Sequence, residues 1–162
     1  LLLMISAAFT GSILTTFEDA LMAYGVLIAY IPMLMDTGGN AGGQASVTII
    51  RGLSLNEIEF GDALRVVWKE MRVAFLCGTT LAAANFVKLL LFDRVGLMVA
   101  LVVCLTLIAS VMIAKVVGCM LPMLARRIGF DPAVMASPFI TTIVDVLSLL
   151  VYFQIAMRVL HI

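Results

Sequence analysis

The sequence predicts an all-α membrane protein with five transmembrane helices and one amphipathic helix at the cytoplasmic surface. Of its 162 residues, 64% are hydrophobic and 12% are charged, and its mean hydropathy is +1.20. Soluble domains are about a quarter charged, so this composition excludes an ordinary soluble domain and a disordered chain. The net charge is zero, which argues against nucleic-acid binding. A span needs about 20 apolar residues, so the chain has room for about five.

Polar interruptions divide the apolar sequence into these spans. Glu18 and Asp19 end the first apolar run, and Asp93 and Arg94 separate the third span from the fourth. Asp131 and Pro132 are typical of an N-cap followed by a first-turn proline, so the fifth span is expected to begin there. We treat residues 1–162 as one transmembrane domain. Its predicted spans are residues 1–16, 21–50, 73–92, 95–123 and 133–157.

The most polar segment, residues 54–72, alternates apolar side chains with charged ones. This pattern is typical of an amphipathic helix lying on the membrane surface, with Trp68 at the interface.

The distribution of basic residues predicts the orientation, because cytoplasmic loops carry an excess of Lys and Arg. The side of the predicted domain with more Lys and Arg residues therefore faces the cytoplasm, which places the N-terminus inside and the C-terminus outside. Because the chain opens directly in an apolar run, we expect further residues upstream. Lys115, inside the fourth span, is expected to snorkel to the cytoplasmic interface. The richer side carries Arg51, Arg65, Lys69, Arg72, Arg126 and Arg127, and the other carries Lys88, Arg94 and Arg158.

Carboxylates at membrane depth are the costliest residues of the chain, at about 2.5–3.5 kcal/mol each near a helix centre. Asp145 lies about twelve residues into the fifth span, near the bilayer midplane. It belongs to a polar stripe that covers about 80° of the helix. This stripe predicts a hydrated path. The alternative is that its Ser and Thr hydroxyls bond back to the helix backbone while Asp145 pairs with Lys115. The stripe consists of Ser137, Thr141, Asp145, Ser148 and Tyr152.

The second span contains a complementary polar set, Asp36, Asn40 and Gln44, within a glycine-rich stretch. The glycines could allow close helix packing, or they could let the helix break where it lines a cavity. Because the second span runs inward and the fifth runs outward, Asp36 and Asp145 should lie at similar depths. Two spans are therefore expected to converge on one layer of oxygen ligands.

Such a layer favours a hard cation. Mg²⁺ retains several of its waters, and a homodimer would double the number of carboxylates around it. Other chemistry has little support. The three cysteines are scattered in apolar runs, the single His161 is next to the C-terminus, and the eleven methionines resemble core filler. No enzyme motif is present, so an enzyme is not expected.

At these residues the sequence resembles the MgtE magnesium-channel family. Three segments carry the resemblance: Ile31 through Gln44 followed by Arg51-Gly52, then Gly129-Phe130-Asp131-Pro132, and Ser137 through Asp145. The match covers essentially the whole chain, as the five-helix membrane domain of the family. Typical members also have cytoplasmic N-terminal and CBS domains, which are absent here, and many have Asn at the position of Gly43.

The resemblance implies a homodimer in the bacterial inner membrane, with a pore between the second and fifth helices of both subunits. Asp145 matches the aspartate that holds a hydrated Mg²⁺, and Thr141 matches the position whose carbonyl helps to hold it. We therefore predict a Mg²⁺ channel or facilitated transporter; a carrier coupled to Na⁺ or H⁺ and a non-transporting membrane subunit remain alternatives. The predicted pore-lining residues are Ser137, Thr142, Ser148, Asp36, Asn40 and Gln44.

Overall fold

A computed structural model of the chain describes residues 2–135 and 138–161, which contain helices and no strand. This confirms the predicted all-α class. Short 3₁₀ turns precede α3 (Gly25–Tyr30), α4 (Phe60–Asp62) and α6 (Pro132–Met135). The α-helices are α1 (Leu2–Thr16), α2 (Glu18–Ala23), α3 (Ile31–Ser54), α4 (Ala63–Leu91), α5 (Leu97–Arg127) and α6 (Pro138–Leu160).

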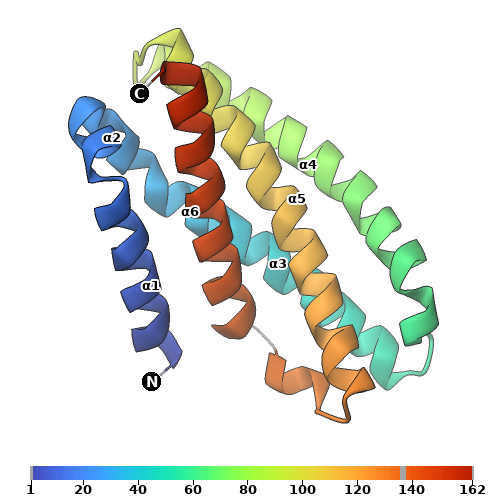
Figure 1. Cartoon of the computed structure of the whole chain (residues 1–162). Helices are drawn as coiled ribbons and strands as arrows, with labels where there is room; N and C mark the ends of the chain where they lie inside the picture. The colour runs from blue at the N-terminus through green and yellow to red at the C-terminus, as the bar shows by residue number, and fades with distance from the viewer. Residues whose placement is uncertain (1, 136–137, 162) are drawn as a thin grey trace.

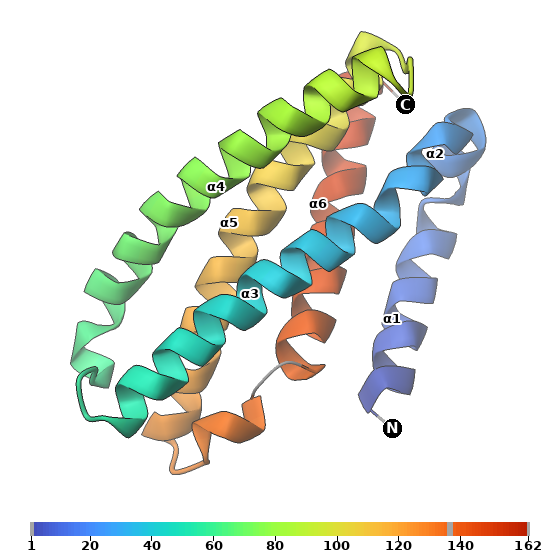
Figure 2. The ribbon, with the colours of Figure 1, turned by 180° about the vertical axis from the view of Figure 1, so that it is seen from behind.

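Helix α5 is the centre of the bundle and packs against α3, α4 and α6. Helix α3 crosses α5 and α6 obliquely, while α1 and α4 lie at opposite edges (Figures 1 and 2). Helix α1 packs on α6. The two termini lie at opposite ends of the bundle in both views (Figures 1 and 2).

Within the described ranges, three helical segments are long and apolar enough to cross a membrane: Phe60–Leu91, Leu97–Arg127 and Pro138–Leu160. The chain therefore has the helices of a multi-pass membrane protein. Helix α1 contributes a shorter apolar segment, Met4–Thr16. Helix α3 has the length of a span, but its polar and glycine-rich motif lowers its hydropathy. Five crossings remain a prediction.

The predicted surface helix at residues 54–72 is not a separate element, and this prediction was wrong. The chain turns at residues 55–59, where Asn56 has a φ of 56°, and α4 then runs without interruption from Ala63 to Leu91. No proline or capping residue separates the polar stretch from the apolar one. The change from polar to apolar residues therefore does not end the helix, because neither stretch contains a residue that breaks it.

The second predicted span is also divided differently. Its break lies at the 3₁₀ turn Gly25–Tyr30, and α3 begins directly afterwards with Pro32 in its first turn, where a proline fits best. The glycine-rich stretch is helical throughout. A hydrogen bond connects this 3₁₀ turn to α6: the buried Tyr152 hydroxyl donates to the Leu27 carbonyl oxygen at 3.0 Å.

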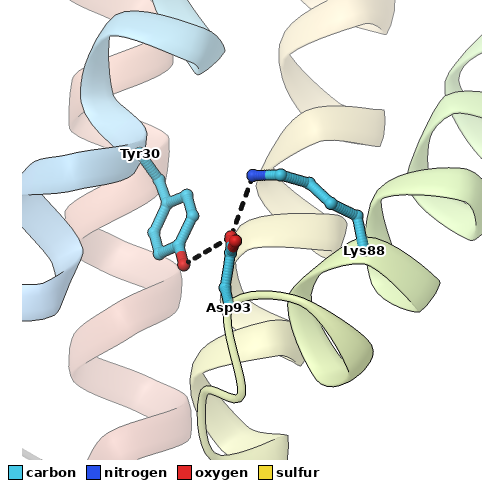
Figure 3. A network of polar contacts seen from close by, with 3 residues as sticks. All are labelled: Tyr30, Lys88 and Asp93. Carbon is cyan, nitrogen blue, oxygen red and sulfur yellow. Dashed lines mark hydrogen bonds and ion pairs between the residues drawn. The ribbon is translucent and has the colours of Figure 1, made fainter.

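A polar cluster closes the end of the bundle where α4 turns into α5 (Figure 3). The Asp93 carboxylate accepts hydrogen bonds from Lys88 Nζ at 2.8 Å and from the Tyr30 hydroxyl at 3.1 Å. The contact ties this turn to the start of α3. The hydrogen bond from Lys88 lowers the pKa of Asp93 below its ordinary value of 3.8.

This lowered pKa predicts a pH-dependent contribution to stability. A carboxylate with a depressed pKa in the folded state stabilises the fold above its unfolded pKa, and the contribution is lost as the pH falls through the folded value. The Asp93→Asn variant should therefore unfold at a lower temperature than the wild type at pH 7. At a pH well below the folded-state pKa of Asp93, where the carboxyl is protonated in both states, the two melting curves should coincide. Thermal unfolding in detergent measures this, and a difference that persists at low pH would contradict it.

Candidate ion site between α3 and α6

An open groove of about 450 Å³ lies between α3 and α6, and two carboxylates line it. Asp36, Gly39 and Asn40 line it from α3, and Thr141 and Asp145 line it from α6. Asp36 is exposed and Asp145 is half-buried. Asp36 and Asp145 therefore line the same groove.

Neither carboxylate forms an ion pair with another residue that the structure describes. The ion pairs of the described residues are Arg65–Asp62, Lys88–Asp93 and Lys115–Glu70, and none includes Asp36 or Asp145. Uncompensated carboxylates in an otherwise apolar helix pair attract cations. No group of three or more His, Cys, Asp or Glu side chains converges as a metal site in residues 2–135 and 138–161.

The glycines of α3 bring the two carboxylate-bearing helices together. A Cβ on Gly38 would lie 2.9 Å from Val144 Cγ1, and a Cβ on Gly39 would lie 3.2 Å from Thr141 Cγ2. Both distances are shorter than ordinary van der Waals contact, so a larger residue at either position would require the side chains of α6 to shift. The packing explanation of these glycines is therefore the one that the structure supports. A helix break is not required.

A second close contact joins α3 to α5. A Cβ on Gly118 would collide with the Gly42 carbonyl oxygen and would lie 3.1 Å from Ala45 Cβ. Backbone atoms cannot rotate away as side chains can. By contrast, a Cβ on Gly43 would meet nothing within 4 Å.

This difference predicts opposite effects for two alanine substitutions on the same helical scaffold. Gly118→Ala should force α3 and α5 apart and destabilise the fold by about 1–3 kcal/mol, as other overpacked cores do. Gly43→Ala is the matched control and should be neutral or stabilising by up to about 1 kcal/mol, because alanine is the better helix former. Unfolding titrations in mixed detergent micelles measure both. Equal stability of the two variants would refute the close-packing account.

The hydroxyls at the start of α6 are occupied by its own backbone. Thr141 Oγ1 donates to the Pro138 carbonyl at 3.2 Å, and Thr142 Oγ1 donates to the same oxygen at 2.7 Å. Thr141 lies in the groove one turn before Asp145, whereas Thr142 is outside its lining. Ser137 lies outside the described residues.

Ser148 is placed away from the groove in this chain. It is 1% exposed, and its Oγ would lie 3.2 Å from a Cβ on Gly38. The polar stripe of α6 therefore divides, with Thr141 and Asp145 facing the groove and Ser148 facing the packed interior. Counting 100° per residue identifies the residues that share one face of a helix, but it does not show which part of that face is covered by neighbouring helices.

Gln44 faces a different groove, of about 620 Å³, between α3 and α4. Asp36 and Asn40 border both grooves, and Cys77 and Lys115 also line this one. The polar face of α3 thus extends from α6 round to α4.

Lys115 is neutralised by a residue that sequence reasoning did not identify. Its Nζ lies 3.0 Å from Glu70 Oε2, and the two side chains are 12% and 16% exposed. The alternative pairing of Lys115 with Asp145 was wrong. Glu70 was missed because residues 54–72 were placed on the membrane surface, whereas in the continuous helix α4 Glu70 faces α5.

Comparison with known proteins gives consistent matches. The profile of the family described as "MgtE: Divalent cation transporter" matches residues 31–155. The magnesium transporter MgtE of Thermus thermophilus is 39% identical over 160 residues, which are 99% of this chain and 35% of that protein. The protein of the same name from Bacillus subtilis is 32% identical over 161 residues, 99% of this chain and 36% of that protein. The chain spans about a third of the length of these curated relatives.

Proposed function

Because the chain belongs to the MgtE family of divalent cation transporters, we propose that it conducts Mg²⁺ down its electrochemical gradient through the pore of a homodimer. The observation that carries this proposal is the groove between α3 and α6, where Asp36 and Asp145 lie together and neither forms an ion pair with a described residue. The names of the Thermus and Bacillus relatives, both magnesium transporters, agree with it.

The cost of a carboxylate at membrane depth supports a bound cation. At about 2.5–3.5 kcal/mol each, Asp36 and Asp145 need compensation that no basic side chain in residues 2–135 and 138–161 supplies as an ion pair. Carboxylate oxygens suit Mg²⁺, which keeps an octahedral shell of about six waters and is seldom stripped of them. Six waters occupy about 180 Å³ at about 30 Å³ each. The groove of about 450 Å³ therefore has room for the hydrated ion.

A second copy would complete this site. One chain contributes two carboxylates, and a two-fold axis along the groove would place four around a central path. Each ion would then be held through its waters by charges from both subunits, tightly enough to select a dication and loosely enough to release it. Asn40 and Thr141 would add polar oxygens at the same level. The resting potential would drive entry, at about 4.6 kcal/mol per 100 mV for a dication.

Orientation follows from the charge distribution. The end of the bundle with the turn at residues 55–59 and with Arg126 and Arg127 would face the cytoplasm. The end with Asp93 would face outward. An ion would then enter near the start of α3, pass Asp36 and Asp145, and leave towards the first turn of α6.

Binding of Mg²⁺ is predicted to raise the thermal stability of the folded protein. At ten times its dissociation constant, a ligand specific to the folded state contributes about 1.4 kcal/mol, or about 3–6 °C in Tm for a chain of this size. MgCl₂ should produce this shift in detergent, whereas NaCl of equal ionic strength should not. Asp145→Asn should abolish most of it.

The matched control is Glu57→Gln, which removes a carboxylate from the exposed turn between α3 and α4 and should keep the full shift. If Asp145→Asn responds to Mg²⁺ as the wild type does, the ion is not held at Asp145. The proposal would then lose its central site.

A further inference from the structure

The first turns of α4 carry three cations on one face. Arg65, Lys69 and Arg72 are spaced i, i+4 and i+7, so at 100° per residue they lie within about 60° of one another. All three are exposed. Arg65 is 3.8 Å from Asp62 but keeps 88% of its side chain exposed. Lys69 and Arg72 form no ion pair with any residue that the structure describes.

An apolar groove begins where this cationic stripe ends. It has a volume of about 530 Å³ and is lined by residues of α4 and α5. Helix α4 itself lies at the edge of the bundle opposite α1 (Figures 1 and 2). Arg72 is the charged residue of its lining, and apolar side chains form the rest. These are Trp68, Met71, Phe75, Leu76 and Met112.

The position of the groove along α4 matches the edge of a bilayer. From Arg72 to Leu91 the helix rises about 29 Å, the thickness of a hydrocarbon core. Arg72 therefore lies at the level where acyl chains meet headgroups, with Lys69 one turn further out. Trp68 is at the depth that tryptophan prefers in membrane proteins.

We propose that this groove is a binding site for an anionic phospholipid of the leaflet on the Arg72 side. The phosphate lies between Lys69 and Arg72, and one acyl chain lies along Phe75, Leu76 and Met112. Charge complementarity selects the occupant. A second copy docked through the same face would bring two cationic stripes together, which is unfavourable. The site is separate from the α3–α6 groove, so it does not depend on the proposed transport function.

Trp68, the single tryptophan of the chain, reports directly on this site. The protein is reconstituted into phosphatidylcholine vesicles that contain a small fraction of either brominated phosphatidylglycerol or brominated phosphatidylcholine. Bromine quenches indole fluorescence at short range. At equal mole fraction the brominated phosphatidylglycerol should quench Trp68 more strongly, corresponding to at least about fivefold enrichment next to the groove. In 1 M NaCl the preference should fall towards unity, because the Debye length is then about 3 Å.

Charge-removing variants assign the preference to named residues. Lys69→Gln, outside the groove lining, and Arg72→Gln should each lower the enrichment by up to about fivefold, the effect of one cation near an anionic surface. Arg72→Lys should keep most of it. Arg158→Gln removes an exposed cation from the far end of α6 and is the matched control.

Three results would each overturn the proposal. Equal quenching of the wild type by the two lipids would show that the groove has no preference for anionic headgroups. An unchanged preference in both Lys69→Gln and Arg72→Gln would show that the cations do not bind the phosphate. Absence of quenching by either lipid would show that protein, such as a second copy, covers Trp68.

Discussion

Glu70→Gln is expected to destabilise the fold by about 3 kcal/mol. Glu70 and Lys115 lie 3.0 Å apart, and only 16% and 12% of their side chains are exposed. Removing one partner of a buried ion pair costs about 3–5 kcal/mol, because the remaining charge keeps its desolvation cost without its compensation. The lower end of this range applies here because both side chains retain some exposure. Lys115 would be left as an unpaired ammonium on α5.

A second substitution separates the effect of leaving Lys115 as an unpaired charge from the effect of losing side-chain packing. Replacing both partners, as in Glu70→Gln with Lys115→Met, removes the buried charge and should restore most of the lost stability. The double-mutant cycle then gives the coupling energy of the pair. Unfolding titrations in mixed micelles measure all four proteins. A Glu70→Gln variant as stable as the wild type would show that the pair is solvated and contributes little.

The same ion pair should influence transport. Lys115 shares the groove between α3 and α4 with Asp36 and Gln44. With Glu70 present, its ammonium is neutralised and leaves the negative potential of Asp36 intact. Without Glu70, it would repel a dication approaching the polar face of α3. Reduced Mg²⁺ flux is therefore expected in Glu70→Gln, together with recovery in the double variant.

The polar layer of the site could be predicted from the sequence. Asp36 and Asp145 stand out because carboxylates are rare in apolar helices. Counting residues along two antiparallel spans was enough to place them at one depth. In the structure the two carboxylates line one groove. Composition likewise predicted the all-α class.

Contacts between helices could not be predicted in the same way. Ser148 is buried because α3 packs on its side of α6 at Gly38. Helix periodicity does not show which side of α6 the neighbouring helix covers. The pairing of Glu70 with Lys115 spans 45 residues and depends on α4 continuing through Arg72. A fall in hydropathy near residue 72 predicts an edge of the membrane, but it does not mark the end of a helix, because α4 continues through it.

The largest functional effect is expected at Asp145. Asp145→Asn keeps the size of the side chain and removes the charge that would hold a hydrated Mg²⁺. If two copies of Asp145 hold the ion, the substitution removes both charges at once. Each hydrogen bond to a charged group contributes about 1.5–3 kcal/mol, so the loss should lower Mg²⁺ flux by at least tenfold. The folded fraction should not change, because Asp145 forms no ion pair with a residue that the structure describes.

Uptake of Mg²⁺ into proteoliposomes tests this account most directly. The vesicles carry an inside-negative potential and no Na⁺ or H⁺ gradient, and they contain the wild type, Asp145→Asn or the control Glu57→Gln. Uptake that follows the potential in the wild type and in Glu57→Gln, and that falls at least tenfold in Asp145→Asn, is the predicted result. Undiminished uptake by a folded Asp145→Asn protein would contradict the central site, and wild-type uptake that requires a counter-ion gradient would contradict a channel.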